Sequence, residues 1–236
     1  MPQISVARKA AFKILMAVER GQSHSDDLLR GQAVNVLSTP DRHLATALVL
    51  GVLRWQILLD RQLHALLKRP NAKLDPEILI ALRMGAFQLL HLDRIPARAA
   101  IDESVELAKQ AGHRFASGIV NAVLRKVRVP SESFSEETPA ALALAQAHPA
   151  WLVERWANNY GLEAARAICR HGQTQPALTV RIASADVADE LAHAGIHLGA
   201  GELLAAARTV LSGEVTATAA FLDGRVRLQD EGSQLV

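Results

Sequence analysis

The sequence contains a single cysteine and few aromatic residues. Cys169 has no second cysteine to pair with, which excludes an intramolecular disulfide framework and a thiolate-rich zinc site. Cysteine usage of this kind fits a reducing compartment, so we expect a cytoplasmic protein. The aromatic residues are five Phe, three Trp and one Tyr, whereas half of the 236 residues are hydrophobic and Ala and Leu dominate. This composition favours close helix packing and a mainly α fold.

Long hydrophobic runs are also missing. The longest stretch free of Asp, Glu, Lys and Arg spans residues 138–153 and contains two prolines, so it is too short for a membrane-spanning helix. The apolar run that follows Lys9 is interrupted by Lys13 and again by Glu19, which differs from a secretory signal. We therefore expect neither secretion nor a membrane partner.

Basic residues are concentrated in the first part of the chain. Residues 1–130 contain 19 Lys and Arg against 11 Asp and Glu, whereas residues 131–236 contain 7 against 13. The formal charges of +8 and −6 are hidden in the overall charge of +2. Such polarity predicts two domains with different partners, the first attracted to a polyanion. A lysine-rich helical domain without such a partner would carry the same charge, so charge alone leaves both interpretations open.

Residues 1–130 have the apolar spacing of a bundle of amphipathic helices. The first helix, residues 4–19, has an apolar face and an opposite face that carries Lys9, Lys13 and Arg20. The second, residues 39–55, is uncharged in its interior and is predicted to run buried through the domain centre. The remaining helices are predicted at residues 75–93, 99–110 and 117–127.

A change of pattern follows Pro130. Residues 131–147 are polar and acidic at first, and we interpret them as a linker with a short helix. Short helices separated by Pro149 and Gly161 come next. Residues 148–236 are expected to form a smaller α+β subdomain, because alternating apolar residues predict strands at 177–182, 215–220 and 225–229 around a helix at 186–194.

The last residues, 231–236, read as the first turn of a helix whose apolar face would have nothing to cover it. We therefore expect the chain to be a truncated fragment.

Six pieces of residues 1–130 occur in the order and spacing of a known RNA-binding domain. Arg8 and Ala11 open the first helix, and the run LRMGAFQLL occupies residues 82–90. In these pieces the sequence resembles the NusB-like domain, which implies an all-helical bundle that binds RNA. The other pieces are DR…LGVLRW…LD within residues 41–60, RIP at 94–96, DESVELA at 102–108 and VNAVLR at 120–125.

Residues 148–236 narrow this resemblance. The segments HPAWLVERWANNYG, QPALTVRI and FLDGRVRLQDEGSQLV are similar to the region between the NusB-like and catalytic domains in the RsmB (Sun or Fmu) family of 16S rRNA cytosine-C5 methyltransferases. The resemblance implies 16S ribosomal RNA as partner, S-adenosylmethionine as methyl donor, and a cysteine thiolate that adds to carbon 6 of cytosine.

In that family both active-site cysteines and the glycine-rich cofactor loop lie downstream of the QDEGSQLV segment. The resemblance therefore implies a chain truncated before the Rossmann-like methyltransferase core. We expect no catalytic and no cofactor-binding residue in these 236 residues, and no methyltransferase activity of the chain alone.

Several residues could suggest chemistry but have simpler explanations. Cys169 lies on a predicted helix, outside the Pro-Cys context of the family, and is expected to be a buried core residue. Gly199 and Gly201 lack the third glycine of a nucleotide-binding loop and are expected in an ordinary loop. His193 and His197 lack a third ligand, so no metal site is predicted.

Basic residues on the first and after the last helix of the predicted bundle are the candidates for phosphate contacts. The alternative is a solvated face, with the residues after the last helix complementing its C-terminus. Other residues are expected to support the fold. Arg83, Arg94 and Trp55 are expected to hold the domain together. Asp102, Glu103 and Glu106 are expected to lie in the acidic first turns of a helix. The predicted RNA-binding set is Arg8, Lys9, Lys13, Arg20, Arg125, Lys126 and Arg128.

Two other functions fit parts of the sequence. A NusB-type transcription antitermination factor, which binds RNA and protein, would explain residues 1–130 but gives residues 148–236 no purpose. A purely structural helical scaffold would leave the opposite charges of the two parts unexplained. The sequence therefore favours the rRNA-recognition portion of a methyltransferase.

Overall fold

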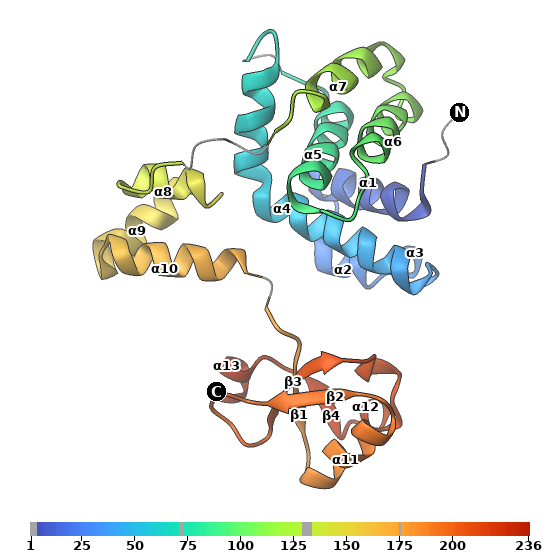
Figure 1. The fold of residues 1–236 in the computed structure, drawn as a ribbon, viewed down its shortest axis with the longest axis vertical. Helices are drawn as coiled ribbons and strands as arrows, with labels where there is room; N and C mark the ends of the chain where they lie inside the picture. Colours follow the sequence, from blue (N-terminus) through green and yellow to red (C-terminus); the bar gives the residue numbers. More distant parts are fainter. Residues whose placement is uncertain (1–3, 71–72, 129–133, 175) are drawn as a thin grey trace. The chain divides into compact units, whose positions relative to one another are not determined.

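A computed structural model describes residues 4–70, 73–128, 134–174 and 176–236 (Figure 1). Its contacts divide the chain into two compact units, residues 1–173 and 174–236. The first unit is helical, and the second combines short helices with a four-stranded sheet, which confirms the mainly α class followed by a smaller α+β part. The domain boundaries at residues 130 and 148 remain predictions.

The first unit begins with a helical bundle, whose long helices start where the sequence supplies capping groups. The Ser5 hydroxyl accepts a hydrogen bond from the Arg8 N–H, and the Ser38 hydroxyl from the Asp41 N–H. Pro40 lies in the first turn of its helix, where its missing N–H costs nothing. The elements are α1 (Val6–Glu19), α2 (Ser25–Leu29), α3 (Gln32–Asn35), α4 (Thr39–Leu66), α5 (Pro76–His91), α6 (Ala97–Gln110), the 3₁₀ turn η1 (Arg114–Ala116) and α7 (Ser117–Leu124).

Helix α5 is the centre of this bundle, in contact with α1, α4, α6 and α7. Every residue from 80 to 88 is buried. The sequence placed α4 at the centre instead, and this was wrong, because α4 exposes Leu50 and Ile57 on its outer side. Close packing around α5 depends on Gly85, where a Cβ would lie 2.5 Å from Leu124 Cδ1.

Helix α4 is long and apolar enough to cross a membrane. Among the described residues it is the one helix that meets both conditions. Its buried side chains explain this composition in another way. They join the core of the bundle and include Leu48, Val49, Val52, Leu59 and Leu63.

Three short helices complete the first unit, as the sequence predicts: α8 (Pro139–Ala145), α9 (Ala150–Tyr160) and α10 (Leu162–Gln173). Gly161 separates the last two and has a φ of 85°, a left-handed conformation that suits glycine. A small core of their own contains Leu142, Val153, Ala165 and Cys169.

The second unit is an antiparallel sheet in the order β2-β3-β1-β4. Val180 and Ile182 of β1 pack with Val187 and Leu191 of α11 in its core, so one face of the sheet is covered by helix. Val226 of β4 joins the same core. The elements are β1 (Thr179–Ile182), α11 (Ala185–His193), β2 (His197–Ala200), β3 (Ala207–Ser212), η2 (Val215–Ala217), α12 (Ala219–Leu222), β4 (Val226–Leu228) and α13 (Glu231–Gln234).

Two expectations about this unit were wrong. Residues 215–220, predicted as a strand, form η2 and the start of α12, because the Thr218 hydroxyl accepts a hydrogen bond from the Phe221 N–H and caps a helix. Gly199 and Ala200, which were expected in a loop, are instead the end of β2 and pair with β3, whereas Gly201 follows the strand.

Candidate nucleic-acid interface

Lys9 and Lys13 are the exposed cations of α1. They lie one helical turn apart, and neither has an ion-pair partner within the described parts of the chain. Both can therefore neutralise phosphate groups without first breaking an internal contact.

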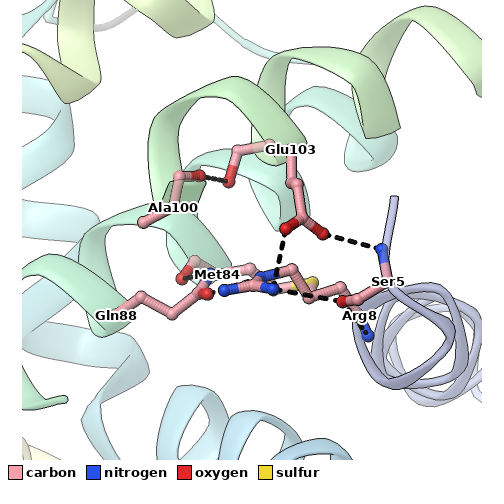
Figure 2. A network of polar contacts seen from close by, with 7 residues as sticks. Ser5, Arg8, Met84, Gln88, Ala100 and Glu103 are labelled. Carbon is pink, nitrogen blue, oxygen red and sulfur yellow. Dashed lines mark hydrogen bonds and ion pairs between the residues drawn. The ribbon is translucent and has the colours of Figure 1, made fainter. Parts of the chain in front are cut away.

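Arg8 does not belong to this exposed surface, which corrects the sequence-based set. Its side chain is buried between α1, α5 and α6, where Nε donates to Gln88 Oε1 at 2.7 Å and Nη1 donates to Glu103 Oε1 at 2.9 Å (Figure 2). The Ser5 hydroxyl is a third acceptor, at 3.1 Å. The sequence contained the signal, because 100° per residue places Arg8 beside Ile4 on the apolar arc of α1. Arg8 therefore supports the fold.

The other arginines of the set are partly engaged. Arg20 pairs with Glu77 at 2.8 Å while its side chain stays about half exposed. Arg125 donates to the Asn121 side chain at 3.0 Å. Arg128 donates to the carbonyl oxygens of Arg125 and Val127, which is the helix-terminal contact that the alternative interpretation expected. These contacts leave Arg20, Arg125 and Arg128 as weaker candidates than the lysines.

Lys126 lies on the rim of a groove that the sequence did not reveal. The groove has a volume of about 530 Å³ and runs between the end of α4 and the outer side of α7. Lys68 and Arg69 contribute two more cations, and no ion pair engages any of the three within the described residues. The floor is apolar and is formed by Leu66, Leu67, Leu74, Ile119, Ala122 and Val123.

An exposed aromatic side chain lies in η1, just before helix α7, which forms one side of the groove. Phe115 is fully exposed, and it lies four residues before Ile119, which is itself half exposed in the groove. A large apolar ring in water is unfavourable unless something covers it. The exposed ring of Phe115 is a candidate for stacking on an unpaired base.

Two of the three expected fold-supporting residues have that role. Arg83 of α5 binds both carboxylate oxygens of Asp60 at 2.7 Å and reaches Glu19 at 2.9 Å. The Trp55 ring stacks on His91 with ring centroids 4.8 Å apart. Arg94 does not share this role, because it is exposed and forms no ion pair with any described residue.

Gly201 and Cys169 are both packed against other residues of the chain. A Cβ on Gly201 would lie 2.8 Å from both Ala207 Cβ and Glu231 Oε1, so the chain itself fills the space beside this glycine. Cys169 is fully buried. Its burial, and to a smaller extent the negative charge of Glu136, raises the pKa of its thiol. No group of three His, Cys, Asp or Glu residues in the described ranges is arranged to hold a metal ion.

Comparison with known proteins matches two parts of the chain to protein families. Residues 5–128 match the NusB family. Residues 148–212 match the ferredoxin-like domain of RsmF/B-like methyltransferases. The first match covers the helical bundle, and the second begins at α9 and extends through β3.

Curated relatives cover the same span. The chain is 38% identical over 238 residues to a probable ribosomal RNA small subunit methyltransferase B of Bacillus subtilis, and 31% identical over 239 residues to ribosomal RNA small subunit methyltransferase B of Pseudomonas putida. Each alignment covers 97% of this chain and 53% of the relative, so the chain spans about half the length of the curated relatives it matches.

Among solved structures, the crystal structure of PH0851 has the same fold over 99% of this chain and 55% of that one, with a TM-score of 0.68 and 17% identity. The helical bundle and the sheet lie in the two parts of the chain that the family models match, and the curated relatives align with both parts. The chain therefore belongs to the NusB family through residues 5–128, and residues 148–212 match an RsmF/B-like ferredoxin-like domain that follows it.

Proposed function

We propose that the chain is the rRNA-recognition portion of an S-adenosylmethionine-dependent rRNA (cytosine-C5) methyltransferase whose target is 16S rRNA. The names of the relatives support the reaction class. The observation that carries the proposal for this chain is the groove beside α7, where Lys68, Arg69 and Lys126 surround an apolar floor.

The groove suits unpaired nucleotides. Proteins recognise single-stranded loops and bulges of RNA by placing cations against phosphates and apolar or aromatic side chains against unstacked bases. In this chain, Lys68 and Lys126 are available for phosphates, and Ile119 and the exposed Phe115 ring are available for bases. Lys9 and Lys13 add a second positively charged contact on α1.

The residues of this chain supply recognition, and we assign the chemistry to residues of the full-length protein outside it. Methylation at carbon 5 of cytosine requires a thiolate that adds to carbon 6, and Cys169 is buried with a raised pKa. S-adenosylmethionine supplies the methyl group when it is bound by the full-length protein. The chain orients the RNA for this step by holding phosphates and bases of the target strand.

An antitermination factor of NusB type is the alternative. The match of residues 148–212 to a methyltransferase-associated domain argues against it, because that function gives the domain no role.

The test is binding of small-subunit rRNA fragments to the full 236-residue chain, measured by fluorescence anisotropy. Reversing three exposed lysines together, Lys9→Glu, Lys13→Glu and Lys126→Glu, is expected to abolish most binding. Affinity should also fall roughly tenfold or more between low and physiological salt, because phosphate neutralisation releases counterions. The matched control is Arg155→Glu, at an exposed position of α9.

A pair of double variants locates the main contact. Lys68→Glu with Lys126→Glu changes only the groove, and Lys9→Glu with Lys13→Glu changes only α1. We expect the groove variant to lose more affinity, because it alone combines cations with an apolar floor. Unchanged affinity in both double variants would contradict the proposal.

A further inference from the structure

Most of the positive charge in residues 174–236 converges on one place. This unit has four arginines and no lysine against eight Asp and Glu, so it is acidic overall. Three of the four arginines, Arg181, Arg225 and Arg227, nevertheless line a single hollow of about 260 Å³. Ile182, Ala183 and Gly224 complete its lining.

Two of these arginines lie directly opposite each other. Arg181 of β1 and Arg227 of β4 are cross-strand partners in the antiparallel ladder. Both are exposed, because their neighbours Val180, Ile182 and Val226 occupy the core face of the sheet. Like charges in directly opposed positions destabilise a sheet. No carboxylate of the described chain pairs with either guanidinium, so the repulsion is not relieved internally.

The third arginine is held in place. Arg225 forms ion pairs with Glu190 of α11 and with Asp223. The Ala183 N–H donates to the Arg225 carbonyl oxygen at 2.9 Å, which ties the end of β1 to the turn before β4. Gly224 has a φ of 75° in that turn. The wall of the hollow is therefore built on fixed backbone, and Arg181 and Arg227 supply the uncompensated charge.

We propose that this hollow binds a phosphodiester group of RNA, as a contact separate from the groove beside α7. The inference rests on the proposed function, because it assigns a second site for the same RNA. Guanidinium groups bind phosphate oxygens through paired, charge-assisted hydrogen bonds. A phosphate between Arg181 and Arg227 relieves their repulsion. The volume lies below the 300–1,000 Å³ of typical small-molecule pockets, which fits one backbone phosphate better than a whole cofactor.

A phosphate contact in this hollow would orient the unit of residues 174–236 relative to the RNA. An acidic unit is repelled by an RNA backbone except where its charge is locally reversed. Contacts to phosphates fix register and orientation rather than sequence preference. The hollow therefore sets which side of the sheet faces the RNA.

The first experiment uses inorganic phosphate and no RNA. Titration of the full chain with phosphate at constant ionic strength, followed by NMR, should shift the amide signals of Ala183 and Gly224 in the wild type. The double variant Arg181→Gln with Arg227→Gln should lose these shifts. Shifts that persist in the double variant, or that are absent from the wild type, would overturn the proposal even if the groove binds RNA.

The second experiment uses a single-stranded fragment of small-subunit rRNA. The double variant should bind several-fold more weakly, and the slope of log affinity against log salt should decrease in magnitude by about 0.7, because the variant loses one phosphate contact and each such contact to single-stranded nucleic acid contributes about 0.7. Arg155→Gln is the control for charge loss at an exposed site. Phosphate shifts with unchanged RNA affinity would assign the hollow to a free phosphate and overturn the RNA assignment.

Thermal unfolding separates binding from a structural role. Because Arg181 and Arg227 repel each other, Arg227→Gln should leave the Tm of the chain unchanged or raise it. A clear decrease in Tm would show that the pair supports the sheet, which would contradict the proposal. If the chain binds no RNA at all while the phosphate shifts appear, the proposed function fails and the anion site stands.

Discussion

The guanidinium of Arg8 contacts the carboxylate of Glu103 at 2.9 Å and so joins helix α1 to helix α6 across the bundle (Figure 2). Both side chains are largely buried, and Gln88 of α5 accepts a further hydrogen bond from the same guanidinium. A basic residue that reads as a phosphate ligand in the sequence therefore acts as an internal contact among three helices.

Replacing Arg8 by Ala should destabilise the bundle without a specific effect on RNA. Loss of the guanidinium leaves a largely buried carboxylate without its cation, which costs about 3 kcal/mol, the low end for such pairs because the Ser5 N–H still donates to Glu103. Urea unfolding measures the effect, with Lys9→Ala as the exposed control, expected within about 0.5 kcal/mol of wild type. Normal stability combined with weaker RNA binding in Arg8→Ala would return Arg8 to the RNA-binding set.

Two helical glycines should respond in opposite directions to alanine. A Cβ at Gly85 would meet Leu124 Cδ1 at 2.5 Å and the Ser104 hydroxyl at 2.8 Å, so Gly85→Ala should destabilise by about 1–3 kcal/mol through overpacking. Gly118 of α7 has no atom within 4 Å of its added Cβ, so Gly118→Ala should stabilise by about 0.5–1 kcal/mol. Equal effects of the two substitutions in urea unfolding would argue against the packing of α5 described above.

Glu231 should make the second unit sensitive to acid. Its carboxylate accepts hydrogen bonds from the N–H groups of Glu202, Leu203 and Leu204 at 2.6 to 3.0 Å, and these bonds lower its pKa below the ordinary 4.5. Because the unfolded chain takes up this proton at a higher pH than the folded chain, the stabilisation is present above pH 4.5 and is lost as the pH falls through the lowered pKa.

Glu231→Gln should therefore lower the Tm at pH 7, and the difference from wild type should shrink below pH 4.5. The control is Glu202→Gln, which removes the same charge nearby but leaves the backbone N–H groups and Glu231 in place. A Tm difference that does not depend on pH would mean that the carboxylate charge contributes nothing.

The chain alone should neither bind S-adenosylmethionine tightly nor methylate RNA. The space beside Gly201 is taken by Ala207 and Glu231, and Cys169 is a buried thiol. Calorimetric titration with the cofactor and a tritium-methyl transfer assay on unmodified small-subunit rRNA measure this. Micromolar cofactor affinity, or turnover that disappears in Cys169→Ala, would contradict the assignment of this chain to recognition.

Strong periodicity made most of the fold predictable. Helices α1, α5 and α6 carry the 3.6-residue apolar repeat over several turns, and their positions were confirmed within a few residues. Strand β2 was missed because it is a four-residue edge strand with a glycine and without clear alternation. The alternating residues 215–220 were misleading, because the Thr218 hydroxyl caps a helix instead.

The candidate site was only partly predictable. Lys126 was found because it lies in a basic run, but Lys68 is far away in sequence and joins it only through the packing of the bundle. The same holds for Arg181 and Arg227, which strand pairing makes neighbours. The charge of single segments is visible in the sequence, whereas the convergence of segments requires the fold.

The most direct test of the central claim is to map which residues touch the RNA. Small-subunit rRNA fragments that carry 4-thiouridine are crosslinked to the full chain by ultraviolet light, and the modified peptides are identified by mass spectrometry. We predict crosslinks in the peptides around Phe115 and Lys126 and around Lys68 and Arg69, which line or precede the groove. Crosslinks confined to residues 134–173, with none in the bundle, would contradict the assignment of this groove to RNA recognition.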